Sequence, residues 1–201
     1  MNRILYSAAS PYSAKVLMAA SHAGVPFEAV LVDTNAEPAL LMDANPLGKI
    51  PVFIDAGTDI AVFDSRAITQ HINRLSGGGA VFPRSAARRG EAERLEALGD
   101  GISDCALAHV YERRARPPEK VHQDWLDKQW AKIERSLDHL NAQPPRTSGK
   151  PHAGHFALRA ALGYLDLRFA DRNWPRGRPK LKRWVKRFDE RFPALAALTP
   201  R

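Results

Sequence analysis

Residues 45–52 read NPLGKIPV, and the pair Asp64-Ser65 follows 13 residues after Pro51. Residues 52–54 are apolar and β-prone, which predicts a buried strand. Residues 55–58 predict a turn and residues 60–63 a second strand, so the two strands form a hairpin. Pro51 is compatible with this arrangement, because a proline at the first position of a strand removes no ladder hydrogen bond.

The pair Asp64-Ser65 begins a predicted helix over residues 66–75. Ser65 is the expected N-cap, and three apolar residues fall on one face of the helix: Ile68, Ile72 and Leu75. The free N–H groups of the first turn favour a carboxylate, and the neighbouring Asp64 could bind an ammonium group. Together these groups match the head of an α-amino acid.

The Ile50-Pro51 bond completes this hypothesis. If it is cis, it forms a fixed turn and leaves the N–H and C=O of Ile50 pointing outward without partners. An extended peptide could then pair with Ile50 as an added strand. The Ile50-Pro51 bond and the Asp64-Ser65 pair each have an ordinary structural explanation, since hairpins often begin with proline and Asp-Ser is a common helix start. The prediction of a peptide-binding site depends on both features occurring at this spacing.

The rest of the first 75 residues alternates between strands and helices. Residues 4–6 and 27–32 predict strands, and residues 11–23 and 38–43 predict helices, with Gly24 as a helix stop. The order β-α-β-α-β-β-α implies a four-stranded sheet with helices on both faces.

After the glycine run at 77–79 the pattern becomes helical throughout. Residues 156–169 are apolar nearly all round, which predicts a central buried helix, and residues 181–192 predict an amphipathic one. The net charge also changes, from −2 over residues 1–75 to +10 over the remainder. We therefore expect three parts: a domain over 1–76, a linker over 77–86 and a helical domain over 87–201.

Composition limits the class of protein. No apolar run is long enough to span a membrane, no secretory signal is evident, and the single cysteine, Cys105, excludes an internal disulfide. We expect a cytoplasmic protein in which Cys105 is a buried, inert thiol. Segment 168–191 holds 10 basic and 3 acidic residues, but Trp184 and Phe188 within it have helix-core spacing. Binding of nucleic acid is therefore not expected.

Several stretches of the sequence resemble the glutathione S-transferase superfamily. Residues 45–52 with 64–65 resemble its glutathione site. Residues 96–104 (EALGDGISD), 133–138 (IERSLD) and 161–168 (ALGYLDLR) resemble the C-terminal domain of a bacterial subgroup typified by YibF. The resemblance implies an α/β thioredoxin-like N-terminal domain followed by an all-α domain, glutathione as co-substrate, and a homodimer.

The resemblance also assigns a catalytic candidate. Serine-type members place their serine at the start of the first helix, where Ser10 precedes Pro11. A hydroxyl donor and a helix N-terminus both stabilise a thiolate, so Ser10 would donate a hydrogen bond to the sulfur of glutathione. Serine before proline is also a favoured helix cap, and both roles are compatible. Ser7 is a weaker alternative.

Further roles follow by analogy. Glutathione would contact Ile50, Asp64 and Ser65, and Lys49 could reach its glycine carboxylate. The acceptor pocket would draw on five residues: Ala9, Tyr12, Asp104, Ala108 and Tyr111. For Asp100 and Asp104 the family offers a second role, contact with the ammonium group of the ligand across a dimer, but we expect a solvated helix face.

His152 and His155 replace the usual capping pair of the family, which leaves the start of that helix unexplained. A third metal ligand is lacking, so we expect no metal site.

Three functions fit this sequence. The first is a glutathione transferase, whose thiolate attacks a small hydrophobic electrophile or a peroxide. The second is a glutathione-dependent peroxidase or disulfide reductase using the same site. The third is a non-catalytic binding protein on the same fold, which the basic segment 168–191 favours and the intact glutathione motifs oppose.

Overall fold

The structure, a computed structural model, describes all 201 residues. A four-stranded sheet with the order β2-β1-β3-β4 forms the first half. Its strands are β1 (Asn2–Tyr6), β2 (Phe27–Leu31), β3 (Val52–Ile54) and β4 (Ala61–Val62). β1 and β2 are parallel, and the other two pairs are antiparallel. This is the predicted thioredoxin-like arrangement, with a second hairpin strand of only two residues.

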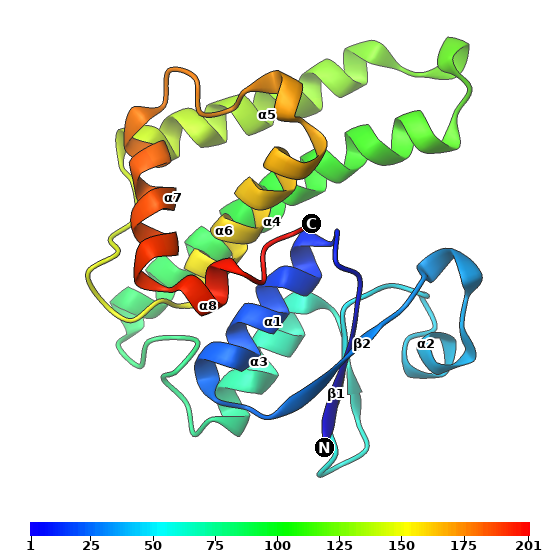
Figure 1. Cartoon of the computed structure of the whole chain (residues 1–201), viewed down its shortest axis with the longest axis vertical. Helices are drawn as coiled ribbons and strands as arrows, with labels where there is room; N and C mark the ends of the chain where they lie inside the picture. The colour runs from blue at the N-terminus through cyan, green and yellow to red at the C-terminus, as the bar shows by residue number, and fades with distance from the viewer.

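Helices cover both faces of this sheet, as the strand pattern predicts. α1 (Pro11–Ala23) and α3 (Ser65–Leu75) lie on one side, and α2 (Ala39–Ala44) lies on the other (Figure 1). Because successive side chains of a strand point to opposite faces, Ile4 belongs to the main core with α1 and α3. Its neighbour Leu5 packs against Leu41 of α2.

The second half is entirely helical. It contains α4 (Ala86–Ala115), α5 (Gln123–Ala142), α6 (Ala153–Arg168), α7 (Pro179–Arg191) and α8 (Pro193–Ala196). Single 3₁₀ turns occupy Thr34–Ala36, Pro118–Lys120 and Ala170–Arg172. No helix combines the length and the apolar character that crossing a membrane requires.

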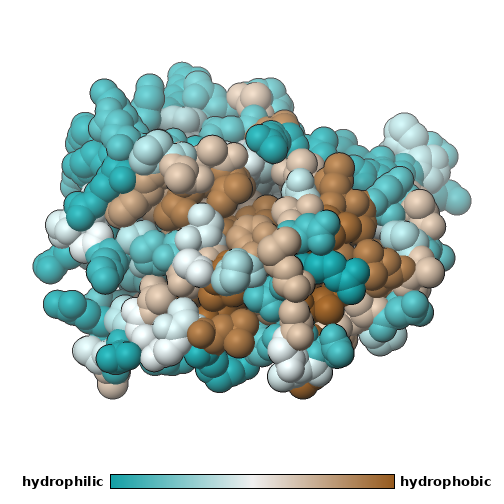
Figure 2. Space-filling view, turned by 60° about the horizontal axis from the view of Figure 1, so that its bottom comes forward, coloured by the Kyte–Doolittle hydropathy of each residue, from teal (hydrophilic) through white to brown (hydrophobic).

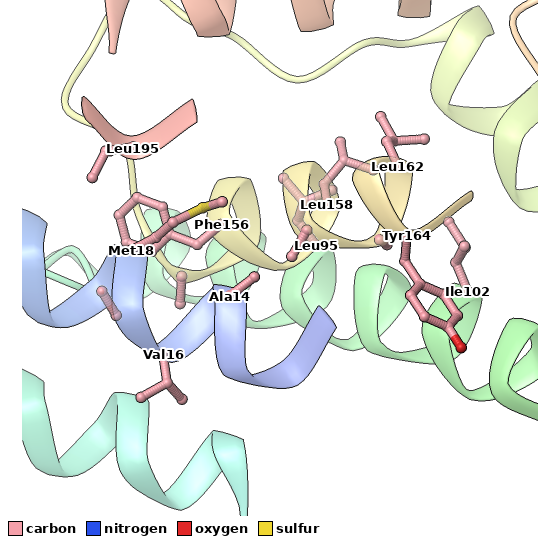
Figure 3. Close-up of a cluster of buried hydrophobic side chains, with 14 of the residues drawn as sticks. Ala14, Val16, Met18, Leu95, Ile102, Phe156, Leu158, Leu162, Tyr164 and Leu195 are labelled. Atoms are coloured by element: carbon pink, nitrogen blue, oxygen red, sulfur yellow. The ribbon is translucent and has the colours of Figure 1, made fainter. Parts of the chain in front are cut away.

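The helix α6 is the centre of the second half. Its residues from Ala153 to Leu165 are all buried, which confirms the predicted central helix. Figure 3 shows its side chains Phe156 and Leu158 beside residues of α1 and α4. A single cluster of 34 buried residues includes Ile4 of the sheet and Phe188 of α7, so the apolar core is continuous across both halves.

The surface is of mixed polarity on the face drawn in Figure 2, where apolar groups lie in the middle between hydrophilic ones. Trp184 and Phe188 of the basic C-terminal segment are not part of the surface, because both are fully buried. Their helix-core spacing was therefore interpreted correctly. Cys105 is only partly buried, so the prediction of a fully buried thiol was too strong.

The glycine-rich connection after α3 is tied to that helix by one side chain. Asn73 Oδ1 accepts hydrogen bonds from the N–H groups of Gly79, Val81 and Phe82, at 3.1, 3.1 and 3.0 Å. Gly77 and Gly78 have φ of 77° and 78°, a region that glycine enters without a steric penalty. The chain can therefore turn back toward Asn73 and enter α4 in a fixed direction.

The start of α6 explains the histidine pair. The backbone N–H of His152 donates to His155 Nδ1 at 3.2 Å, and His155 Nε2–H donates to the carbonyl of Arg146 at 2.8 Å. A histidine at the third helical position thus replaces the usual glutamate or glutamine of a capping box. Burial lowers the pKa of His155, which favours the neutral ring that this bonding needs. The pair is a helix cap, and no group of three metal-ligating side chains is present.

The closest approach of α4 and α6 yields the first prediction. A Cβ at Gly99 would lie 2.6 Å from the backbone carbonyl carbon of Ala157. We expect Gly99→Ala to lower the free energy of unfolding by about 2 kcal/mol, because overpacking outweighs the gain in helix propensity. Gly90→Ala in the same helix, where nothing lies within 4 Å, should instead be stabilising by up to about 1 kcal/mol. Equal stabilisation of both variants in urea denaturation would contradict this packing.

Candidate functional site

A cleft of about 910 Å³ lies between the two halves of the molecule. The loop after β1, the loop before β3 and the start of α3 supply one side, and α4 with the end of α6 supplies the other. The cleft brings together most of the residues expected from the sequence: Ala9, Ser10, Tyr12, Lys49, Ile50, Pro51, Asp64, Ser65, Asp104 and Tyr111. Ala108 alone among the expected residues is not in its lining.

The loop before β3 is organised by a buried asparagine. Asn45 Nδ2 donates to the carbonyl of Lys49 at 2.8 Å, and Asn45 Oδ1 accepts from the N–H of Leu47 at 3.0 Å. This side chain thereby fixes the turn that leads into the Ile50-Pro51 bond, which is cis. The N–H and C=O of Ile50 have no hydrogen-bond partner in the chain and line the cleft. Both groups are therefore available to a ligand.

The helix α3 begins one residue earlier than expected. Asp64 is its N-cap, with Oδ1 accepting from the N–H groups of Arg66 and Ala67 at 3.0 and 3.4 Å. Ser65 is therefore the first helical residue and not the cap, because the longer carboxylate of Asp64 reaches two N–H groups at once. Asp64 Oδ2 makes no hydrogen bond and the residue is exposed. One carboxylate oxygen caps the helix, and the other remains free for a cation. The peptide bond between Phe63 and Asp64 is also cis.

Ser10 is the N-cap of α1. Its Oγ accepts a hydrogen bond from the N–H of Ser13 at 3.2 Å, and Pro11 follows as the first helical residue. The Ser10 hydroxyl lines the cleft and donates to no group of the protein. A serine hydroxyl can accept and donate at the same time, so capping leaves its proton available to a ligand.

One stripe of α4 forms the opposite wall. Asp104, Leu107, Tyr111 and Arg114 recur at spacings of three and four residues and all line the cleft. Ala108 lies four residues after Asp104 but does not line the cleft, so its place in the acceptor pocket stays a prediction. The phenol of Tyr12 donates a hydrogen bond to Asp104, which joins the start of α1 to this wall.

A buried ion cluster connects the two walls. Lys15 of α1 is fully buried, and its Nζ lies 2.9 Å from both carboxylate oxygens of Asp100 and 3.3 Å from Glu96 Oε1. Arg66 Nε donates to Asp100 Oδ2 at 2.8 Å. Asp100 is only 5% exposed, so the expectation of a solvated helix face was wrong for this residue. Its carboxylate is instead occupied by two cations of its own chain.

Several residues of this site were not predicted from the sequence. Lys15 carried a usable signal, because it is the only lysine, arginine, aspartate or glutamate between Pro11 and Ala23. Arg66 directly follows the Asp64-Ser65 pair and lines the cleft beside it. No local pattern marks Arg114 and Arg168, which line the other end of the cleft together with Tyr164.

The ion cluster gives a second prediction. Lys15→Met should lower the free energy of unfolding by about 3–5 kcal/mol, because it leaves the buried carboxylates of Glu96 and Asp100 without their shared cation. Burial already raises the pKa of Glu96, an effect that Lys15 opposes. Without Lys15 this pKa rises further, so the deficit should shrink as pH falls through it and the carboxyl becomes neutral.

Denaturant titration of the Lys15→Met variant between pH 7 and about 5 measures this effect. The double variant Lys15→Met/Glu96→Gln should recover part of the lost stability at neutral pH, since it removes one uncompensated charge. A pH-independent deficit with no recovery would show that Lys15 acts only by filling space.

The sequence of this protein is similar to those of known proteins. Residues 9–75 match the family model described as glutathione S-transferase, N-terminal domain, and residues 123–187 match glutathione S-transferase, C-terminal domain. The uncharacterised GST-like protein YibF of Escherichia coli K12 is 31% identical over 188 residues, which is 92% of each chain.

Solved structures agree over the full length. A glutathione transferase family member from Pseudomonas fluorescens Pf-5 with bound glutathione is 32% identical, with a TM-score of 0.88 over 100% of both chains. Another structure of a family member from that organism, with bound S-(propanoic acid)-glutathione, is 29% identical. Its TM-score is 0.83, over 100% of this chain and 98% of the other. With its thioredoxin-like sheet, its helical second half and the cleft between them, the chain belongs to the glutathione S-transferase family.

Proposed function

We propose that this protein binds glutathione in the cleft and uses its thiolate to attack an electrophilic acceptor, as a glutathione transferase. The main support is that Ile50, Asp64 and Ser10 line one cleft, and each has a polar group that makes no hydrogen bond within the protein. Relatives of 32% and 29% identity that contain glutathione and an S-alkylated glutathione support the same ligand.

The γ-glutamyl end of glutathione would bind at the start of α3. Asp64 Oδ2 is free to accept from the ammonium group, and the first-turn N–H groups with the Ser65 hydroxyl can donate to the carboxylate. Arg66, fixed by Asp100, adds a cation beside that carboxylate. The side chain of Asp64 thus has two functions, one for each carboxylate oxygen.

The middle of the tripeptide would pair with Ile50. Its free N–H and C=O can exchange two hydrogen bonds with the cysteinyl residue, as an added strand does. The glycine carboxylate would then lie toward Lys49, whose ammonium group is exposed and has no acidic partner. The sulfur is directed toward the start of α1.

The thiolate would form beside Ser10. A hydrogen bond from the Ser10 hydroxyl and the N-terminus of a 13-residue helix both favour the anionic sulfur. Both lower the thiol pKa from its free value of about 8.5. The sulfur then bonds to an electrophilic carbon while the leaving group departs with its bonding electron pair. The proton of the thiol passes to water.

Asp64 provides the first test of this function. Asparagine caps helices about as well as aspartate, so Asp64→Asn should leave the stability of the protein within about 0.5 kcal/mol of wild type while removing the charge. We expect the affinity for reduced glutathione to fall at least tenfold, because the ammonium group loses a charge-assisted hydrogen bond. Calorimetric titration of both proteins measures the affinity, with Asp43→Asn as a control at an exposed acid outside the cleft. Unchanged affinity would refute the proposed binding mode.

Ser10 provides the second test. Ser10→Ala should raise the thiol pKa of bound glutathione by about 1 unit and lower kcat/KM by about 10- to 100-fold. The pKa follows from thiolate absorbance as a function of pH, and the rate from conjugation of an aryl halide. Ser10→Thr retains both the cap and the hydroxyl and should restore both values. If Ser7→Ala reproduces the loss and Ser10→Ala does not, the catalytic hydroxyl is that of Ser7.

A further inference from the structure

Two arginines without acidic partners face the end of the cleft away from the proposed glutathione contacts. Arg114 lies in the last turn of α4 and Arg168 ends α6, and both line the cleft. Neither forms an ion pair, whereas the other cleft arginine, Arg66, is bonded to Asp100. Two arginines without an acidic partner therefore line the same cleft.

A buried tyrosine lines the cleft together with these arginines. Tyr164 of α6 is 4% exposed and lines the cleft. Figure 3 shows its ring beside Ile102, with the hydroxyl at the end remote from the α6 backbone. Burial raises the pKa of this phenol, and the positive charges of Arg168 and Arg114, which line the same cleft, oppose that rise. The Arg114 guanidinium carbon is also 5.7 Å from the ring centroid of Tyr111.

This group is continuous with the position of the reactive sulfur. Tyr12, two residues after Ser10, lines the same cleft as Tyr164. The two acids of α4 that line the cleft form no ion pair with either arginine: Asp104 accepts a hydrogen bond from Tyr12, and Asp100 is paired with Lys15 and Arg66. An acceptor that reaches from the sulfur toward α6 would therefore meet positive charge.

Helix position alone accounts for only part of this arrangement. Cations in the last turn of a helix interact favourably with its C-terminal carbonyl groups, and Arg113 occupies the same turn of α4 as Arg114. The Arg113 side chain, however, donates to Gln123 and does not line the cleft. Complementing the helix ends does not require Arg114 and Arg168 to line the same cleft as Tyr164.

We propose that the acceptor of this protein carries a carboxylate, which Arg114, Arg168 and the Tyr164 hydroxyl bind while Leu107, Val110 and Tyr111 contact its apolar body. The planar guanidinium groups match a carboxylate with paired hydrogen bonds. This inference rests on the proposed function and replaces the uncharged hydrophobic electrophile expected from the sequence with an anionic one.

A matched pair of acceptors tests this preference. 4-(Chloromethyl)benzoate and 4-(chloromethyl)benzamide present the same benzylic carbon and differ in one charge. In each, the sulfur of glutathione bonds to that carbon while the carbon–chlorine bond breaks and chloride leaves with the electron pair. The two products, S-(4-carboxybenzyl)glutathione and S-(4-carbamoylbenzyl)glutathione, also serve as binding probes in calorimetry, without any requirement for turnover.

We expect the carboxylate product to bind about tenfold more tightly than the amide product. Arg114→Gln/Arg168→Gln should reduce this preference to within about twofold while leaving the affinity for glutathione unchanged. Arg113→Gln removes the same charge one residue away, outside the cleft, and should keep the preference. The ratio of kcat/KM for the two chlorides, corrected for their uncatalysed rates, should change in the same order.

The outcomes distinguish failure of the carboxylate site from failure of the proposed function. If wild type binds glutathione and both products equally well, the carboxylate site is refuted and the proposed function stands. A preference that survives in the double variant, or that Arg113→Gln also removes, refutes the assignment to Arg114 and Arg168. If wild type binds none of the three ligands, the proposed function fails, and the inference fails with it. Thermal melting of each variant verifies that it is folded.

Discussion

The buried ammonium group of Lys15 is the interaction on which the arrangement of the two halves depends. It comes from the first helix and ends between two carboxylates of α4, Glu96 and Asp100, at 2.9–3.3 Å. Burying a charge is costly unless it is paired and hydrogen-bonded. Each of these three groups therefore requires the other two, and α1 has one favourable position against α4.

This constraint extends to the cleft. Asp100 also accepts from Arg66, and the Thr69 hydroxyl donates to Glu96 at 3.0 Å, so the cluster fixes the start of α3 as well. The apolar packing of α1 against α6 acts in the same direction. The walls that would bind the two ends of a glutathione conjugate are thus positioned by buried charges and by a shared core.

Two helix caps of the candidate site also have a polar group left for a ligand. Ser10 and Asp64 each satisfy backbone N–H groups of the helix they begin, and each retains one polar group for a ligand. Neither role excludes the other, because a hydroxyl both donates and accepts and a carboxylate has two oxygens. At the far ends of α4 and α6, Arg114 and Arg168 likewise complement helix C-termini while facing the cleft.

The sequence by itself determined the features that depend on neighbours along the chain. Strand and helix order, the limits of α1 at Pro11 and Ala23, the hairpin after Pro51 and the buried α6 follow from periodicity, capping and turn chemistry, which act over a few residues. The local parts of the site, Ser10, Ile50 and the Asp64-Ser65 pair, were predictable for the same reason. The one-residue error at α3 arose because Asp64 and Ser65 are both good caps, and only the folded geometry selects between them.

The tertiary structure decided which distant side chains meet. Asp100 was expected in solvent and is buried, because Lys15 lies 85 residues away and its reach depends on helix packing. Which residues of α4 line the cleft depends on how that helix packs against α6. Arg114, Arg168 and Tyr164 line one cleft for that reason as well. Local propensities fix an element and its ends, whereas its rotation about its own axis is fixed by what it packs against.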